Sequence, residues 1–367
     1  MSTGKRIERA WKALWMRVLA AIMPAPARGA LPEWDARPHR VLYLRYDRIG
    51  DMILATGLLR AIARAHPSVA LDVLASPANA PILEGSPHVR RVLVFRKKRR
   101  STWPALLREL RAARYDVVID GMVLTPSLTT LLLMLATGAR WRVGIGGRSN
   151  DFVYTLPVPP APADAHMVEQ SAVTARPFGI DPARADWRPE LFLLDAERER
   201  AEETWTHAAG SGARLLVNIS SAQARNRWPD ERFVEVLRHA RRRWPGARVL
   251  VIGAPGEAAA VERLARAGGA EPVSGTTLRE AVALVAAADV VLTPDTSIAH
   301  MAAALGRPSV VMTLERARRF VPYRAPGRVL FAEGDTLQEL PLAPVLDALD
   351  ELLRRADSRC GGSPGIS

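Results

Sequence analysis

The chain has 367 residues, which is enough for two domains of ordinary size, and 48% apolar with 24% charged residues is a globular composition. No uninterrupted apolar run approaches the roughly 20 residues of a membrane-spanning helix, and a single cysteine, Cys360, excludes a disulfide framework and a cysteine-based zinc site. Basic residues exceed acidic ones by 13, and residues 1–100 hold 19 basic against 7 acidic side chains. This local excess favours docking to an anionic membrane surface, while nucleic acid is the lesser interpretation because no binding motif accompanies the charge.

Residues 5–23 are predicted to form an amphipathic helix. Basic residues fill much of its surface, and apolar residues recur along one face at Ile7, Trp11, Leu14, Trp15, Val18 and Ile22. This pattern is typical of a helix lying in a membrane interface, but a helix packed on its own protein shows it too, so both interpretations stay open. Arg17 divides the apolar stretch that a secretory signal would need intact. Residues 24–38, rich in Pro, Ala and Gly, are predicted to be a linker that completes an N-terminal segment of residues 1–38.

From Arg40 onwards, short β-rich runs alternate with helical patterns. The predicted strands are 41–46, 69–75, 89–95, 116–120 and 141–145, and the predicted helices are 52–65, 103–114 and 127–136. Strands that alternate with helices predict a parallel sheet covered on both faces. Seven prolines then interrupt the pattern between 150 and 195.

The alternation restarts after this interruption. It predicts strands at 214–219, 248–252, 290–293 and 309–312, and helices at 230–244, 257–267, 278–287, 297–305 and 342–355. The predicted fold class is therefore α/β, with two doubly wound Rossmann-like domains, 39–180 and 181–355, facing a central cleft, and a flexible tail at 356–367. Ligands are expected at the carboxyl ends of the strands.

The first strand runs into a helix through the segment Tyr46–Thr56, which contains the pair Gly50-Asp51. Gly50 permits a tight turn, and the Asp51 carboxylate at the helix start has the chemistry of a general base for a hydroxyl. The alternative is that Asp51 only caps the helix.

Three segments of the second half carry polar groups at predicted strand ends. Asp295, Thr296 and Ser297 open a helix whose free N–H groups suit an anion, and His300 follows one turn later. The loop that follows the 214–219 strand offers Ser220, Ser221, Arg225 and Arg227, and arginine suits a diphosphate. Glu257 and Thr276 complete the predicted ligand-binding set, although each segment alone also fits an ordinary cap or a solvated loop. The sequence offers no metal-ligand cluster, so no metal and no cofactor are expected.

Together these segments resemble glycosyltransferase family 9, the heptosyltransferases. The resemblance rests on Arg45–Asp51 with its continuation to Pro67, on Trp228-Pro229, and on the block from Asp295 to Pro308. It implies a GT-B fold and an inverting, metal-independent transfer of heptose from ADP-heptose to a lipopolysaccharide or lipooligosaccharide inner core. It also implies that Asp51 is the general base, that Asp295–Ser297 and His300 surround the donor, and that Ser220 and Ser221 lie near the donor phosphates.

Two positions depart from the pattern of the family. Asn226 stands where the family usually has a phosphate-binding lysine, so Arg225 or Arg227 would replace it, and residues 314–319 replace a Gly-Pro-Thr-type loop. The departures leave open a different donor sugar, or a non-catalytic protein that binds sugar nucleotides or glycans and retains the fold.

A basic run, Arg96, Lys97, Lys98, Arg99 and Arg100, follows the third predicted strand. In a parallel sheet this places the run at the same edge as Asp51, where an anionic glycolipid acceptor would approach. With the N-terminal helix, it predicts a peripheral position on the inner, cytoplasmic face of the membrane. The alternative is a solvated run that serves solubility.

Overall fold

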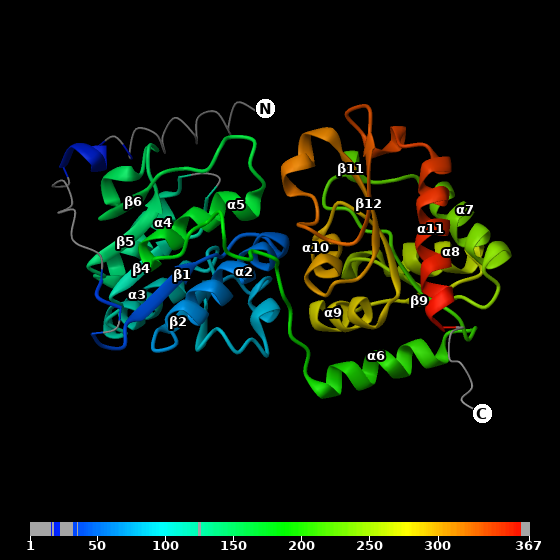
Figure 1. The fold of residues 1–367 in the computed structure, drawn as a ribbon, viewed down its shortest axis with the longest axis horizontal. Helices are drawn as coiled ribbons and strands as arrows, with labels where there is room; N and C mark the ends of the chain where they lie inside the picture. Colours follow the sequence, from blue (N-terminus) through cyan, green and yellow to red (C-terminus); the bar gives the residue numbers. More distant parts are fainter. Residues whose placement is uncertain (1–15, 17, 23–31, 35, 124–125, 361–367) are drawn as a thin grey trace. The chain divides into compact units, whose positions relative to one another are not determined.

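The computed structural model describes residues 16, 18–22, 32–34, 36–123 and 126–360. The chain forms two compact units, Met1–Trp187 and Arg188–Ser367, here called the N-terminal and the C-terminal unit. The sequence analysis placed this division between residues 180 and 181. Each unit contains one parallel six-stranded sheet with helices on both faces (Figure 1).

In the N-terminal unit the strand order is β3-β2-β1-β4-β5-β6, and every neighbouring pair is parallel. The strands are β1 (Arg40–Leu44), β2 (Ala70–Ala75), β3 (Arg91–Val94), β4 (Val117–Asp120), β5 (Trp141–Ile145) and β6 (Leu156–Val158). The chain winds outwards from β1 in one direction and from β4 in the other. The carboxyl ends of β1 and β4 therefore lie side by side at the point where the winding reverses.

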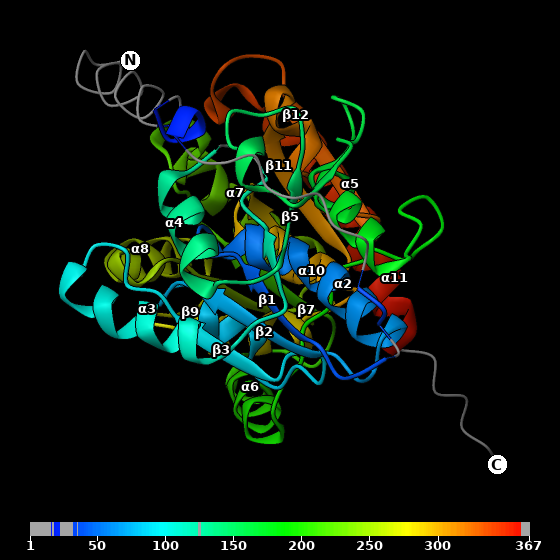
Figure 2. The ribbon, with the colours of Figure 1, turned by 90° about the vertical axis from the view of Figure 1, so that its left-hand side faces the viewer.

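The helices of this unit are α2 (Ile49–Ala65), α3 (Trp103–Ala112), α4 (Leu128–Thr137) and α5 (Met167–Ala172). Helices α2 and α5 pack together on one face of the sheet, and α3 and α4 pack together on the other (Figure 2). Local chemistry sets the bounds of α4, because Ser127 accepts a hydrogen bond from the Thr130 N–H at its start and Gly138, with φ of 65°, ends it.

In the C-terminal unit the strand order is β12-β11-β10-β7-β8-β9, again parallel throughout. The strands are β7 (Arg214–Asn218), β8 (Arg248–Ile252), β9 (Glu271–Val273), β10 (Val290–Pro294), β11 (Ser309–Leu314) and β12 (Gly327–Ala332). The two doubly wound parallel sheets that the sequence predicted are confirmed.

The helices of the C-terminal unit are α6 (Asp195–His207), α7 (Asp230–Arg243), α8 (Ala258–Gly268), α9 (Leu278–Ala287), α10 (Ser297–Ala304) and α11 (Leu342–Cys360). Helices α7, α8 and α11 cover one face of the sheet, while α9 packs between α6 and α10 on the other. Helix α11 includes residues 356–360, for which the sequence predicted a tail, because buried Ala356 continues the apolar stripe of Leu352 and Leu353.

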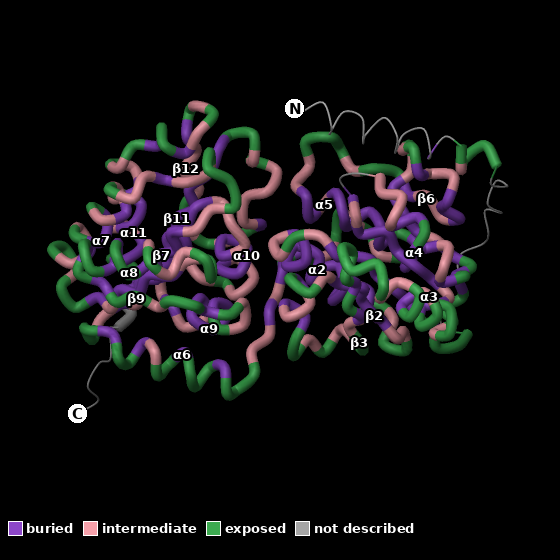
Figure 3. Tube along the Cα trace, turned by 180° about the vertical axis from the view of Figure 1, so that it is seen from behind, coloured by how far each residue is buried: buried purple, intermediate pink, exposed green. Residues whose placement is uncertain are grey.

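Burial follows the strands in both units, and exposed positions gather on the outer sides of the helices (Figure 3). In the N-terminal unit, Met16 packs with Leu42, Leu44 and other buried side chains in one apolar cluster, and Leu19 lies against it. Two other apolar side chains of this helix are exposed instead of buried: Val18 is 38% exposed and Ile22 is 70% exposed. The described end of the predicted N-terminal helix therefore packs one side on its own unit and exposes the last two members of the predicted apolar face.

The rest of the predicted N-terminal helix lies outside the described residues. So does most of the predicted linker, but Trp34 belongs to the packed structure: it stacks on Phe178 with ring centroids 4.4 Å apart and donates a hydrogen bond to the Pro177 carbonyl. Within the described part of the chain, no helix has both the length and the apolar character that crossing a membrane requires.

Candidate functional site

The segment from Arg45 to Asp51 connects β1 to α2 at the carboxyl edge of the N-terminal sheet. Helix α2 begins at Ile49, and its N-cap, Arg48, has extended backbone and makes no side-chain cap. Asp51 is thus the third helical residue and is 4% exposed. The alternative that Asp51 only caps the helix does not describe this geometry, because two arginine side chains bind its carboxylate.

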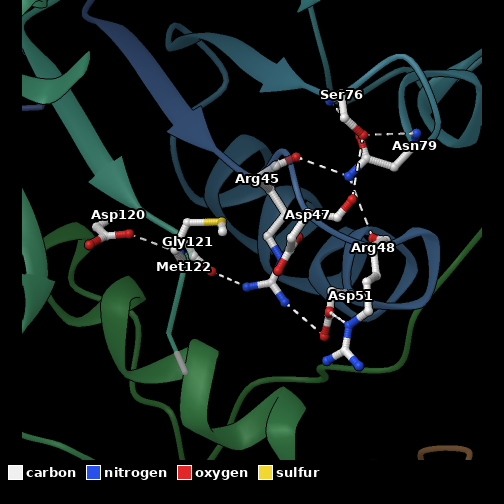
Figure 4. A network of polar contacts seen from close by, with 9 residues as sticks. All are labelled: Arg45, Asp47, Arg48, Asp51, Ser76, Asn79, Asp120, Gly121 and Met122. Carbon is white, nitrogen blue, oxygen red and sulfur yellow. Dashed lines mark hydrogen bonds and ion pairs between the residues drawn. The ribbon is translucent and has the colours of Figure 1, made fainter. Parts of the chain in front are cut away.

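Arg45 and Arg48 bind different oxygens of Asp51 (Figure 4). Nη2 of Arg45 lies 3.0 Å from Oδ1, and Nε of Arg48 donates to Oδ2 over 2.8 Å. Arg45 is buried and has two further partners. Its Nε lies 3.1 Å from Oδ1 of Asp47, and its Nη1 donates a hydrogen bond to the Gly121 carbonyl. Arg45 therefore ties the ends of β1 and β4 to the start of α2.

A buried asparagine holds the backbone of this segment in place. Nδ2 of Asn79 donates to the carbonyl of Arg45 over 3.2 Å and lies 3.5 Å from that of Arg48. Asn79 is itself fixed through its Oδ1, which accepts from the Ser76 N–H over 2.7 Å. Hydrogen bonds from the loop after β2 therefore fix the backbone of the loop after β1, from which Arg45 and Arg48 extend.

The carboxylates of this edge have perturbed acidities. Burial raises the pKa of Asp47 to about 6, because the attraction of Arg45 offsets it only in part and the Asp51 charge adds to it. Burial also raises the pKa of Asp120, at the end of β4, even though its Oδ2 accepts a hydrogen bond of 2.6 Å from the Tyr154 hydroxyl. The edge therefore holds two carboxyl groups, those of Asp47 and Asp120, whose pKa values are raised by burial.

Asp51 has the geometry of a proton acceptor. Each carboxylate oxygen has two lone-pair positions, and each Asp51 oxygen is bound by one guanidinium group. Each oxygen therefore has one lone-pair position that neither guanidinium group uses, and the two guanidinium groups hold the oxygens in orientation.

In the C-terminal unit, Asn218 joins the carboxyl ends of β7 and β10. Its Nδ2 donates to Thr293 Oγ1 over 2.9 Å and to Thr296 Oγ1 over 3.2 Å. Its Oδ1 accepts from the hydroxyl of Ser220 over 2.7 Å and from the Ser220 N–H over 3.2 Å. Asn218 therefore places Ser220 and the start of α10 at one edge of the sheet.

The start of α10 combines a cap with half-buried polar residues. Thr296 is the N-cap, and its Oγ1 accepts from the Ile298 N–H over 3.3 Å, as the alternative interpretation of an ordinary cap expects. Asp295, Thr296 and Ser297 are half-buried at the sheet edge, and His300 is buried one turn further along. Ser297 and the positive end of the α10 dipole thus remain suited to an anion.

The loop after β7 gives its two arginines different surroundings. Arg227 pairs with Glu257 and with Asp230, both at 2.9 Å, and the hydrogen bond to Asp230 contributes most to its raised pKa. Glu257 also accepts from the Ala254 N–H over 3.1 Å. Arg225 is exposed, and no partner for its guanidinium lies among the described residues. Of the two, Arg225 has all of its guanidinium donors available to a diphosphate, while Arg227 uses two of its nitrogens on carboxylates.

The remaining predicted donor-binding residues lie apart from Asn218. Ser221 follows Ser220, but its hydroxyl turns back to donate to the Gln223 carbonyl over 2.6 Å. Thr276 follows β9 at the same sheet edge and lines a hollow of about 470 Å³ that also contains Glu197 and Arg279. Within the described structure, no hydrogen bond connects Thr276 to Asn218 or Thr296.

The basic run Arg96–Arg100 follows β3 at the carboxyl edge of the N-terminal sheet, and all five side chains are exposed. Lys97 Nζ lies 5.9 Å from the ring centroid of Tyr46, the residue before Asp47. The run therefore lies next to the Arg45–Asp51 segment on one edge of one sheet.

The described residues contain no group of three or more His, Cys, Asp or Glu side chains placed to hold a metal ion. The roles predicted for the individual site residues, and a reaction without a metal, stay predictions at this point. Sequence reasoning did not assign roles to Arg45, Asp47, Arg48 or Asn218. The available signal was their position, since each is a polar residue directly at or after the end of a buried strand.

Comparison with known proteins gives the chain a family context. The model of glycosyltransferase family 9 (heptosyltransferase) matches residues 103–324, which is more than half of the chain. The lipopolysaccharide core heptosyltransferase OpsX of Haemophilus influenzae is 22% identical over 305 residues, covering 80% of this chain and 84% of that protein.

Two solved structures are similar throughout. A family 9 glycosyltransferase from Veillonella parvula superposes with a TM-score of 0.78 at 20% identity, covering 89% of this chain and 99% of that one. The Escherichia coli ADP-heptose lps heptosyltransferase II superposes with a TM-score of 0.70 at 23% identity, covering 86% and 99%. These likenesses support the same fold, with two doubly wound units.

Proposed function

The chain belongs to glycosyltransferase family 9, and we propose that it transfers heptose from ADP-heptose to the inner core of a lipopolysaccharide or lipooligosaccharide. It is a glycosyltransferase of GT-B fold. The observation that carries the proposed reaction is the buried Asp51 carboxylate at a sheet edge, oriented by two arginines. The names of the relatives supply the donor and the acceptor.

The proposed reaction is a direct displacement at the anomeric carbon. The acceptor hydroxyl oxygen bonds to that carbon as the bond to the diphosphate oxygen breaks, which inverts the configuration. Asp51 takes the hydroxyl proton, and ADP leaves with the electron pair of the broken bond. Arg225, the start of α10 at Ser297 and the Ser220 hydroxyl stabilise the charge on the diphosphate, so no metal or other cofactor is needed.

The test of this assignment is Asp51→Asn, which keeps the shape of the side chain and removes the base. We expect turnover with ADP-heptose and an inner-core acceptor to fall by roughly 10²–10⁴-fold, with donor affinity unchanged. Asp164→Asn is the matched control, because Asp164 is an exposed carboxylate of the same unit. If Asp51→Asn has the same turnover as wild type, Asp51 is not the general base.

The donor is tested separately, because Asn226 replaces the lysine usual in the family. We expect ADP-heptose to raise the melting temperature more than UDP- or GDP-sugars, and mass spectrometry to find the acceptor heavier by one heptose. Nucleotide binding without transfer would instead favour a non-catalytic protein that binds sugar nucleotides, and transfer from another ADP-sugar would change the donor.

The proposed position is peripheral, on the cytoplasmic face of the inner membrane, where the glycolipid acceptor is presented. Two features of the N-terminal unit support it: exposed Val18 and Ile22 at the end of an amphipathic helix, and the exposed run Arg96–Arg100 beside Tyr46. Apolar side chains inserted at the interface and basic side chains near anionic headgroups add their contributions to membrane affinity.

A further inference from the structure

The two arginines that bind Asp51 differ in their exposure. The Arg45 side chain is 4% exposed, and its Nε, Nη1 and Nη2 each face an oxygen of the protein. The Arg48 side chain is 70% exposed and uses only Nε, which donates to Asp51. In Figure 4 only its Nε is joined to Asp51, and no hydrogen bond joins its two terminal nitrogens to any described residue.

The position of Arg48 is nevertheless well defined. Its carbonyl accepts from the Met52 N–H over 3.2 Å and lies 3.5 Å from Nδ2 of Asn79, so its backbone is fixed at the start of α2. Its Nε bond to a buried carboxylate restricts the side chain as well. A guanidinium group held at one edge presents its other donors in a planar fork, which matches the oxygens of a carboxylate or phosphate.

We propose that Arg48 recognises an anionic group of the acceptor, a carboxylate or a phosphate close to the hydroxyl that receives the sugar. The inference rests on the proposed function, because it assumes that Asp51 is the base. The terminal nitrogens of Arg48 bind the anion while its Nε stays on Oδ2 of Asp51. One guanidinium group then sets the distance between the acceptor anion and the base.

This arrangement makes Arg48 a determinant of acceptor specificity. An acceptor whose reactive hydroxyl has an anionic neighbour is aligned with Asp51, and one without that neighbour is not. Lysine cannot replace this function fully, because its ammonium group is a single point of charge and cannot bind Asp51 and an anion through opposite edges.

The test combines a variant with a modified acceptor. Transfer is measured for wild type and Arg48→Gln with an inner-core acceptor, with the same acceptor methyl-esterified at its carboxylates, and with it dephosphorylated. With the native acceptor we expect Arg48→Gln to raise acceptor KM and lower kcat/KM by roughly 10–100-fold, the value of a charge-assisted hydrogen bond pair, with donor KM unchanged. With the acceptor that lacks the recognised anion, the loss in Arg48→Gln relative to wild type should shrink to the part that comes from its bond to Asp51, and the modification that shrinks the loss identifies the group.

Equal losses for the variant with all three acceptors would overturn the proposal, because they would assign Arg48 a role towards Asp51 alone. So would an Arg48→Gln enzyme that matches wild type on the native acceptor. Arg64→Gln is the matched control, an exposed arginine in the last turn of the same helix, and Arg48→Lys should fall between wild type and Arg48→Gln.

Acceptor binding without donor, measured by surface plasmon resonance, separates this inference from the proposed reaction. If wild type binds the acceptor without transferring heptose, the reaction is wrong, but an affinity loss in Arg48→Gln that disappears with the neutralised acceptor still supports recognition by Arg48. A wild-type protein that does not bind the acceptor overturns the inference.

Discussion

Asp47 and Asp51 share the guanidinium group of Arg45, yet they stand in different surroundings. Asp51 has a second cation, because Arg48 binds its other oxygen. Arg48 makes no ion pair with Asp47, and its charge lowers the pKa of Asp47 only slightly. Burial, together with the nearby Asp51 charge, raises this pKa to about 6. The N-terminal unit therefore holds one carboxylate well paired at the expense of its neighbour, which fits a site where Asp51 acts and Asp47 completes the charge balance of Arg45.

The raised pKa of Asp47 gives a pH-dependent stability. Because the folded state binds the proton more tightly than the unfolded state, whose pKa is near 3.8, ionised Asp47 destabilises the fold, and this cost develops as pH rises from about 4 to about 6. We expect Asp47→Asn to remove the cost and to increase the free energy of unfolding by roughly 1–3 kcal/mol at pH 7.5 relative to its effect at pH 4. Urea unfolding at both pH values measures the difference.

The matched control is Asp164→Asn, in which an exposed carboxylate of the same unit is removed. It should change the unfolding free energy equally at both pH values. A loss of stability in Asp47→Asn at pH 7.5 would contradict the account, because it would mean that ionised Asp47 contributes more through Arg45 than its burial costs.

Single residues at strand ends were within reach of sequence reasoning, but their partners were not. Asp51 and Thr296 stand out because each is a polar residue at a predicted helix start that follows a predicted strand. The role of Arg45 depends on Gly121, which is 76 positions away and becomes its neighbour only when β4 pairs with β1. Likewise Arg227 was predicted to serve a diphosphate, and its pairing with Glu257 depends on the folded loops after β7 and β8.

At the scale of elements, the strands missing from the sequence prediction are β6, β9 and β12, and each lies at an edge of its sheet. Central strands such as β10 are buried at every position, which produces a recognisable apolar run. Strands β6 and β9 contain Pro157 and Pro272, and an edge strand tolerates a proline that a central strand would not. Strands β6 and β9 thus lack the apolar continuity on which the prediction relied, whereas β3, also at an edge, keeps it and was predicted.

Helix α6 was missed for a related reason. Its buried residues are Glu197, Ala201 and Trp205, a stripe one residue wide at four-residue spacing that contains a charge. Glu197 is buried because Arg279 of α9 binds both of its oxygens, with Nε at 2.7 Å from Oε1. A hydrophobic pattern cannot reveal a helix that docks through an ion pair.

Asn218 supports the next prediction, because its side chain connects two elements. Asn218→Ala leaves Thr293, Thr296 and Ser220 without their shared partner at the carboxyl edge of β7 and β10. We expect the free energy of unfolding to fall by roughly 1–3 kcal/mol, since buried polar groups lose their hydrogen bonds. The affinity for ADP should fall as well if the loop and α10 form the donor site, and calorimetric titration with ADP measures it.

Gln223→Ala is the control for this variant, because Gln223 is an exposed residue of the same loop. It should unfold like wild type. If Asn218→Ala lowers the free energy of unfolding but leaves the affinity for ADP unchanged, Asn218 connects β7 and β10 structurally. Asn218 and its partners would then not belong to the donor site.

At the scale of the whole molecule, the alternation of strands and helices was enough to predict two doubly wound sheets, because the central strands had clear patterns and predicted helices follow β1, β4, β7, β8 and β10. The distribution of charge adds a functional asymmetry to this repetition. The basic excess of residues 1–100 lies in the N-terminal unit, which also carries the exposed run Arg96–Arg100 and the exposed Val18 and Ile22. Membrane affinity should therefore be a property of the N-terminal unit.

Liposome flotation tests this expectation. Wild type should float with anionic vesicles at low salt and be released near 1 M salt, where the screening length falls to about 3 Å. Replacing the five basic residues of the run by glutamine should abolish flotation, since each contributes about 1 kcal/mol near an anionic surface. The control replaces five exposed arginines of the C-terminal unit, so that net charge changes equally: Arg238, Arg242, Arg243, Arg266 and Arg354.

The apolar contribution is tested in the same assay with Val18→Asp/Ile22→Asp, which places charges on the exposed face of the N-terminal helix. At low salt, where wild type is bound, this double variant should float less than wild type, because it loses the inserted apolar area that adds to the attraction of the basic residues. Leu132→Gln is its control, since Leu132 of α4 is 50% exposed in the same unit but belongs to no predicted membrane-facing stripe. If deleting residues 1–24 and neutralising 96–100 together left flotation unchanged, attachment would not proceed through this unit and the peripheral-membrane proposal would be wrong.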